Sequence, residues 1–155
     1  MAYDKAKWHF DAADFPKGIE IEQGGVHIAF FYRWMLENNF VGEDLMDDMA
    51  EEVQSVREGN HSALDLLFEF NDGVLLAEDF DDAGVAFADQ YYEGNTMFAD
   101  KYSSYLADYG TLMLEYLVGV EESDYGIIYS DENYQKVKEI IDRRYQEFLQ
   151  LEATS

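Results

Sequence analysis

The spacing of apolar residues predicts helices over most of the chain. Between Val26 and Leu36 the residues are apolar almost throughout, with Arg33 as the main interruption. A helix without a polar face is normally covered on all sides, so residues 23–38 are predicted to form a buried central helix. Residues 43–57 instead place apolar side chains three and four positions apart with carboxylates between them, which is typical of an amphipathic surface helix.

Four further helices follow from capping residues, apolar spacing and turn residues, over residues 62–70, 81–92, 98–116 and 130–149. Ser62 is a predicted N-cap, and Asn71-Asp72-Gly73 is predicted to form the turn after its helix. The helical spacing continues across Gly110, where a bend or break is expected. These elements predict a mainly α protein of about six helices.

Two segments do not show a helical pattern. Residues 3–22 are predicted to be irregular, with a turn at Pro16-Lys17-Gly18, and residues 125–129 fit either a short strand or a buried loop. No linker, internal repeat or low-complexity tract divides the sequence. We therefore expect a single helical domain over residues 1–155, built around the central helix.

Composition changes this picture mainly through charge. The 155 residues carry a formal net charge of -24, yet 48% of them are hydrophobic, so the low hydrophobicity that disorder requires is missing. Residues 34–100 hold 18 acidic residues and one basic residue, Arg57. A negative field of this kind repels nucleic acid and anionic membranes and attracts surfaces rich in lysine and arginine. A basic protein is therefore the expected partner.

The sequence also restricts the expected cellular location and the kinds of chemical site. It has no cysteine, which excludes disulfides, thiolate metal sites and a cysteine nucleophile. No signal peptide is recognisable at the N-terminus, and no apolar stretch reaches the roughly 20 residues that span a bilayer. These features favour a cytoplasmic location.

Metal binding has little support from residue spacing. His9, His27 and His61 form no short ligand motif, and each is expected to be a hydrogen-bonded structural histidine. The segment 79–84 resembles the start of a calcium loop but has Ala83 where an oxygen ligand is needed and Gln90 where a bidentate glutamate is needed. We expect no metal and no cofactor.

Catalytic motifs are equally weak, so the chain is not predicted to be an enzyme. It lacks a nucleophile elbow, a phosphate loop and a dinucleotide fingerprint. The alternative is a small-ligand binder or enzyme with a pocket lined by Trp8, His9, His27 and Trp34. A tyrosine stripe at positions 102, 105, 109 and 116 is expected to pack in the core, with a binding face as the alternative.

Several fragments together resemble a family of small acidic bacterial proteins of uncharacterised function, which we associate with immunity proteins against polymorphic toxins. The chain has Ala29 where that family's pattern leads us to expect glycine. The resemblance implies no catalytic residues. It is carried by Tyr3-Asp4-x-Ala6-x-Trp8-His9, Asp14-Phe15-Pro16, His27-Ile28-x-x-Phe31-x-x-Trp34, Asp72-Gly73, Gly84-x-Ala86-Phe87-Ala88-x-x-Tyr91-Tyr92 and Asp108-Tyr109.

The leading hypothesis is an acidic, immunity-type inhibitor that neutralises a basic partner, such as a toxin or nuclease, by occluding it. Electrostatic steering makes such association fast and salt-sensitive. The residues expected at the interface come from the central acidic segment: Asp47, Asp48, Glu51, Glu52, Glu78, Asp79, Asp81 and Asp82.

Overall fold

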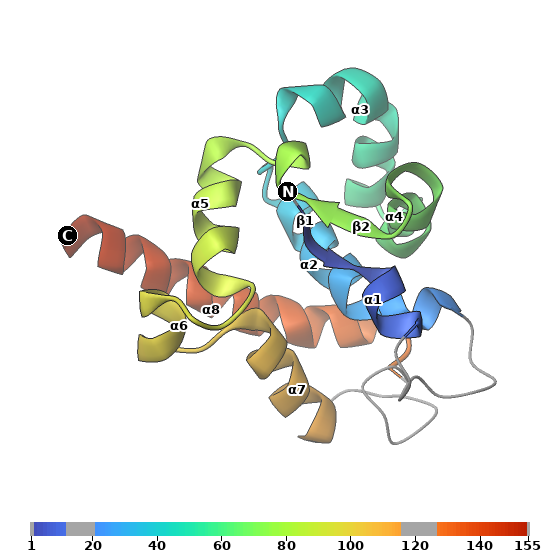
Figure 1. The fold of residues 1–155 in the computed structure, drawn as a ribbon. Coiled ribbons are helices and arrows are strands. Elements are labelled where there is room, and N and C mark those ends of the chain that lie inside the picture. Colours follow the sequence, from blue (N-terminus) through green and yellow to red (C-terminus); the bar gives the residue numbers. More distant parts are fainter. Residues whose placement is uncertain (1, 12–20, 116–126, 155) are drawn as a thin grey trace.

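The centre of the protein is a helix, α2 (Val26–Glu37), that other elements cover on every side (Figure 1). The computed structural model describes residues 2–11, 21–115 and 127–154. Ten of the twelve residues of α2 are buried, and the helix packs against α3, α4 and α8. The predicted buried central helix is thus confirmed, with a 3₁₀ turn, η1 (Ile21–Gly25), leading into it.

The two helices after α2 lie where the sequence pattern places them. In α3 (Glu43–Arg57) four apolar side chains of the predicted stripe are buried, and the carboxylates face outward. The Ser62 hydroxyl caps α4 (Ala63–Asn71) by accepting hydrogen bonds from the backbone N–H groups of Leu64 and Asp65. The turn at Asp72-Gly73 is confirmed by positive φ angles at both residues.

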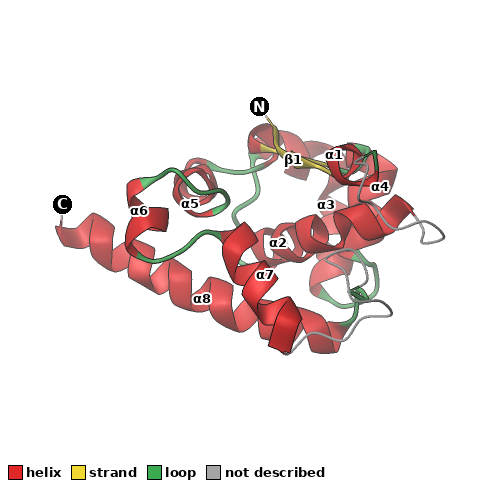
Figure 2. Ribbon diagram, turned by 60° about the horizontal axis from the view of Figure 1, so that its bottom comes forward, coloured by secondary structure: helices red, strands yellow, loops and turns green. Residues whose placement is uncertain are grey.

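The second half of the chain forms α5 (Asp82–Tyr91), α6 (Met97–Lys101), α7 (Tyr105–Glu115) and the long α8 (Asp131–Thr154), as Figure 2 shows. The expected break at Gly110 is wrong, because α7 runs through it. The interruption lies at residues 102–104, where the Ser104 hydroxyl accepts from the Ala107 N–H and begins a new helix. Glycine inside a helix costs only about 1 kcal/mol, which packing can offset.

The N-terminal segment differs from its prediction as irregular chain. Residues Ala2–Lys5 form strand β1, which pairs antiparallel with β2 (Val74–Leu76), and α1 (Ala6–Phe10) follows directly. Elements of three to five residues contain too few periods for a sequence pattern to reveal them. Gly73, at φ 75°, allows this close packing, since a Cβ there would lie 3.1 Å from the Cβ of Ala6.

A bulge in β1 decides which side chains enter the core. The register shifts between Ala2 and Asp4, and both Tyr3 and Asp4 are buried although they are neighbours. A regular strand would send them to opposite faces. The bulge removes that alternation and turns the Asp4 carboxylate inward.

Some predictions fall on residues outside the described ranges, namely the turn at Pro16, Tyr116 and residues 125–126. Ile127 takes part in an isolated bridge, and Ile128 and Tyr129 are irregular, so at these three positions no strand forms. The mainly α class is confirmed, with one small two-stranded sheet in the described part. Within those same ranges, no helix has both the length and the apolar character needed to cross a bilayer.

Aromatic rings fill the space around α2. Phe31 has five ring neighbours with centroids 5.0–6.5 Å away, contributed by α2, α5, α7 and the residue after α5. Tyr105 and Tyr109 belong to the same buried set, whereas Tyr102 is partly exposed. The tyrosine stripe is therefore core packing at positions 105 and 109.

Replacing Phe31 with alanine is expected to lower the free energy of unfolding by about 4 kcal/mol, because a buried phenyl ring is lost and a cavity remains. Denaturant unfolding followed by circular dichroism measures this loss. Met97, whose side chain is 85% exposed, gives the matched control. Met97→Ala should change the free energy by less than about 0.5 kcal/mol. Equal effects of the two substitutions would contradict the proposed core.

Candidate functional site

The start of α3 is held against the segment that precedes α5, and this brings two acidic stretches of the chain together. The Gly42 N–H donates to the Asp79 carbonyl at 2.8 Å, and the Asp81 N–H donates to the Phe40 carbonyl at 3.0 Å. Val41 and Phe80 form a β-bridge between these contacts. The acidic residues of α3 and of the 3₁₀ turn η2 (Ala77–Asp79) therefore lie on one rigid support.

Two grooves run along this junction and share Asp44 as a lining residue. Their volumes are about 280 and 380 Å³. Of the described residues that line them, none is basic. We call the acidic lining residues the acidic surface; they are Glu43, Asp44, Asp48, Asp72, Glu78, Asp79, Asp81 and Asp82.

Neighbouring carboxylates contribute to the pKa of the Asp79 carboxyl. Burial raises the pKa of its carboxyl, a hydrogen bond from Asn71 lowers it, and the negative charges of Glu78 and Asp44 raise it again. Arg57, the one basic residue of segment 34–100, lies at the other end of α3 and donates to the Leu36 carbonyl at 2.7 Å. It therefore does not offset the charge of the grooves.

The residues predicted for the interface divide between the grooves and the open face of α3. Asp48 and Asp79 meet in one groove, and Glu78, Asp81 and Asp82 line the other. The remaining three, Asp47, Glu51 and Glu52, lie on α3 outside both linings. Asp81 also caps α5, since its carboxylate accepts from the Gly84 N–H at 2.8 Å.

Glu43, Asp44 and Asp72 belong to the acidic surface but were not among the residues predicted for the interface. Asp44 stands one helical turn before Asp48, so its position on the same face was available from the i,i+4 spacing. Asp72 lies in the turn after α4 and reaches the groove only through the fold.

A different group of polar side chains is buried beneath β1. The two Asp4 oxygens lie 2.8 Å from Nε2 of His9 and 3.0 Å from Nε2 of His27. The Tyr92 hydroxyl donates to the same carboxylate at 2.8 Å, as does the Lys5 N–H. Burial by itself raises the pKa of Asp4, but the hydrogen bonds from His27 and His9 hold it well below its usual range.

The alternative pocket of two histidines and two tryptophans comes together only in part. His9 and His27 meet edge to face, with ring centroids 4.5 Å apart. Trp8 is 53% exposed and has the Lys5 ammonium near its ring. Trp34 is fully buried among other aromatic rings, with its N–H bound to Asp142 at 2.8 Å. The structure therefore joins the histidines but not the tryptophans.

Comparison with known proteins places the chain in a family. The sequence profile of a family described as a domain of unknown function, DUF7832, matches residues 2–122. The chain belongs to the DUF7832 family. No curated protein and no solved structure matches it. The acidic surface lies within the matched DUF7832 region, as does the buried group formed by Asp4, His9 and His27. Helix α8 lies beyond it.

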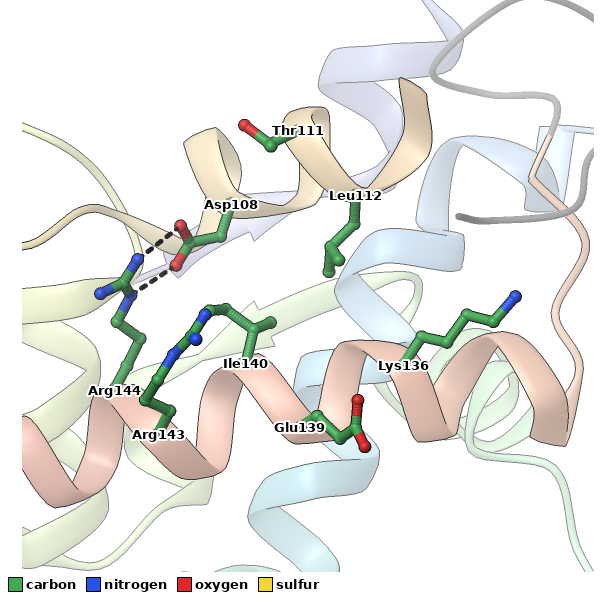
Figure 3. Close-up of a pocket in the computed structure, with 8 residues that line it drawn as sticks. All are labelled: Asp108, Thr111, Leu112, Lys136, Glu139, Ile140, Arg143 and Arg144. Carbon is green, nitrogen blue, oxygen red and sulfur yellow. Dashed lines mark hydrogen bonds and ion pairs between the residues drawn. The ribbon is translucent and has the colours of Figure 1, made fainter. Parts of the chain in front are cut away.

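The contact between the DUF7832 region and α8 contains a third hollow of about 590 Å³ (Figure 3). It holds basic side chains, with Lys136, Arg143 and Arg144 projecting from α8. Arg144 forms two hydrogen bonds with Asp108 of α7, at 3.0 and 3.2 Å, and the Tyr91 hydroxyl donates to the same carboxylate. Arg144 thus pairs with Asp108 across the contact between α7 and α8.

Buried tyrosines give this DUF7832 protein a specific response to alkali. Burial raises the pKa of Tyr91, Tyr92 and Tyr105 well above that of a free tyrosine, and the charges of Asp108 and Asp4 add to this for Tyr91 and Tyr92 respectively. The folded state keeps these protons while the unfolded chain releases them near pH 10. Stability is therefore expected to be retained below about pH 10 and lost above it, by up to about 1.4 kcal/mol per pH unit for each such tyrosine.

Denaturant unfolding between about pH 8 and pH 12 measures this slope. Tyr92→Phe is the matched variant. Above about pH 10 its free energy of unfolding should fall less steeply than that of the wild type, by the slope that one tyrosine contributes. Phenolate absorbance from all the tyrosines at pH values where the protein is still folded would contradict the burial of these hydroxyls.

Proposed function

We propose that the protein binds a basic protein partner through the acidic surface. The observation that carries this proposal is the convergence of eight carboxylates on two adjoining grooves whose described lining has no basic residue. Backbone hydrogen bonds between residues 40–42 and 79–81 fix the grooves before a partner arrives. A preformed charged surface loses little conformational freedom on binding.

The shape and lining of the grooves favour basic side chains over a small organic ligand. Ligand pockets usually enclose about 300–1,000 Å³ and are lined mostly by apolar groups. These grooves lie at or below the lower part of that range, and carboxylates supply half of the lining residues in the smaller groove and five of eight in the larger. Long lysine and arginine side chains, reaching in from a partner's surface, fit them better.

In the specific form of this proposal, the chain is an immunity-type inhibitor that occludes a basic toxin or nuclease. Nuclease surfaces use lysine and arginine to hold phosphates. A rigid array of carboxylates presents negative charge in place of those phosphates. The family resemblance in the sequence motivates the inhibitor hypothesis. The carboxylates of the grooves are the groups that would pair with the partner's lysine and arginine side chains.

Reversing charge on α3 is expected to slow association with the partner. The partner is first isolated from a lysate of the source cells at low salt and eluted with salt. Association rates of the purified pair are then compared for the wild type and Asp44→Lys/Asp48→Lys, two exposed residues of α3 that line the grooves. The double variant should associate at least about tenfold more slowly at low salt, and the difference should shrink as salt screens the field.

The matched control is Glu93→Lys/Asp100→Lys, which changes the net charge by the same amount at exposed positions near α5 and α6. It should retain most of the wild-type rate. Equal slowing by both double variants would mean that net charge, rather than the acidic surface, attracts the partner. An unchanged rate for Asp44→Lys/Asp48→Lys would remove α3 from the interface.

A second candidate function is a small-ligand or catalytic site around His9 and His27. The observation in its favour is that both imidazoles meet one buried carboxylate. A histidine oriented by a carboxylate is a common arrangement for proton transfer and for metal binding. A wild-type rate of partner association together with loss of a measured activity in His9→Ala would favour this candidate.

A further inference from the structure

The residues Asp4, His9 and His27 come from three different elements and point their ligating atoms at one another. Asp4 lies in β1, His9 in α1 and His27 in the first turn of α2. One ligand atom from each residue lies within 4.8 Å of the other two. The cluster does not share residues with the acidic surface.

Local packing explains why these three segments converge. The bulge in β1 turns Asp4 inward, and the chain enters α1 one residue after Lys5. At the start of α2, a Cβ on Gly25 would lie 2.8 Å from the Phe68 ring and 3.4 Å from the Cβ of Ala6. Glycine at this position therefore allows α2 to approach α1 closely enough for the two histidines to meet.

The surroundings of the cluster orient its members. Each Asp4 oxygen keeps one hydrogen bond that does not involve histidine, from the Lys5 N–H to one oxygen and from the Tyr92 hydroxyl to the other. The Tyr105 hydroxyl donates to the His27 carbonyl and fixes that part of α2. Such outer contacts are what a metal site needs to hold its ligands in place.

We propose that Asp4, His9 and His27 bind one divalent transition-metal ion, with Zn²⁺ as the best match. Two imidazoles and one carboxylate suit zinc and related first-row ions. Calcium and magnesium prefer all-oxygen sites. The three side chains leave at least one coordination position for water or a substrate, as in catalytic zinc sites.

The three side chains are close enough to share an ion but must rearrange to accept it. Ligand atoms at the 2.0–2.1 Å bond lengths of tetrahedral zinc lie about 3.3 Å apart. The nitrogen–oxygen distances are now 2.8 Å from His9 to one Asp4 oxygen and 3.0 Å from His27 to the other, and one ligand atom from each residue lies within 4.8 Å of the other two. The side chains must therefore shift to bring all three ligand atoms around one ion. The ion enters from the His9 side, where the side chain is 21% exposed, against 5% for Asp4 and 7% for His27.

The competing explanation is a purely structural cluster, in which the two imidazoles neutralise a buried carboxylate through hydrogen bonds. It predicts no saturable binding of zinc. Abundant surface carboxylates add a background of weak binding, which must be separated from the site. Calcium and magnesium in excess occupy the carboxylates without competing for imidazole nitrogen.

The test uses the full chain, stripped with a chelator and titrated with Zn²⁺ in a calorimeter and with Co²⁺ in a spectrophotometer, both in excess Ca²⁺ and Mg²⁺. The expected result is one ion per chain, with micromolar or tighter affinity for Zn²⁺, and visible absorption from bound Co²⁺. His9→Ala should weaken Zn²⁺ binding by about 100-fold or more, because even loss of an outer-contact residue costs 10–100-fold.

His61→Ala is the matched control, since His61 lies apart from the cluster beside Glu69. It should bind zinc as the wild type does. Nitrogen-15 spectra of the wild-type imidazoles give a readout that needs no variant: Zn²⁺ must shift His9 and His27 and leave His61 unchanged. No stoichiometric binding by the wild type, or equal affinity in His9→Ala, overturns the proposal. Either result leaves partner binding by the acidic surface untouched.

Discussion

The absence of a polar face on α2 constrains the rest of the structure. Its apolar side chains must be covered all round, and polar atoms that it carries into the interior are costly to leave without a partner. Among the described residues of this helix, the Tyr32 hydroxyl is left without one. The Trp34 N–H reaches Asp142 of α8, and His27 reaches Asp4 of β1. Elements from both ends of the sequence are therefore required around one central helix.

This requirement divides the acidic residues into two groups with different physical roles. Asp4 and Asp108 are buried and serve as acceptors for tyrosine hydroxyls and basic side chains. The carboxylates of α3, η2 and the start of α5 lie at or near the surface, where Asp79 and Asp81 accept hydrogen bonds from Asn71 and the Gly84 N–H. The negative charges of Glu78 and Asp44 raise the pKa of Asp79, so this carboxylate is held at a cost that a nearby positive charge would reduce.

The sequence was informative where the pattern was long or the signal was local. The buried run at residues 26–36, the amphipathic repeat of α3 and the Ser62 cap each depend on several residues or on one strong capping interaction, and each was predicted correctly. The β1–β2 pair was not, because its strands contain four and three residues and their pairing joins positions about 70 residues apart. Local patterns carry no information about such contacts.

Prediction of the sites is limited in the same way, because their residues are distant in the sequence and meet only in the fold. Acidic side chains on α3 were identified from their helical face, but their meeting with Asp79 and Asp82 depends on the bridge between Val41 and Phe80. His9 and His27 lie 18 positions apart and were expected to be structural histidines, and only the alternative pocket placed them together. Asp4, which joins them, was not considered, since only a bulge turns its side chain inward.

The position of α8 has a consequence for defining the family. The DUF7832 match ends at residue 122, yet Tyr145 and Phe148 of α8 cover the rings of Phe87 and Trp34. A fragment truncated at the end of the match would leave these aromatic surfaces bare and Asp108 without Arg144. The region that the family profile matches thus leaves out a helix that covers part of the core.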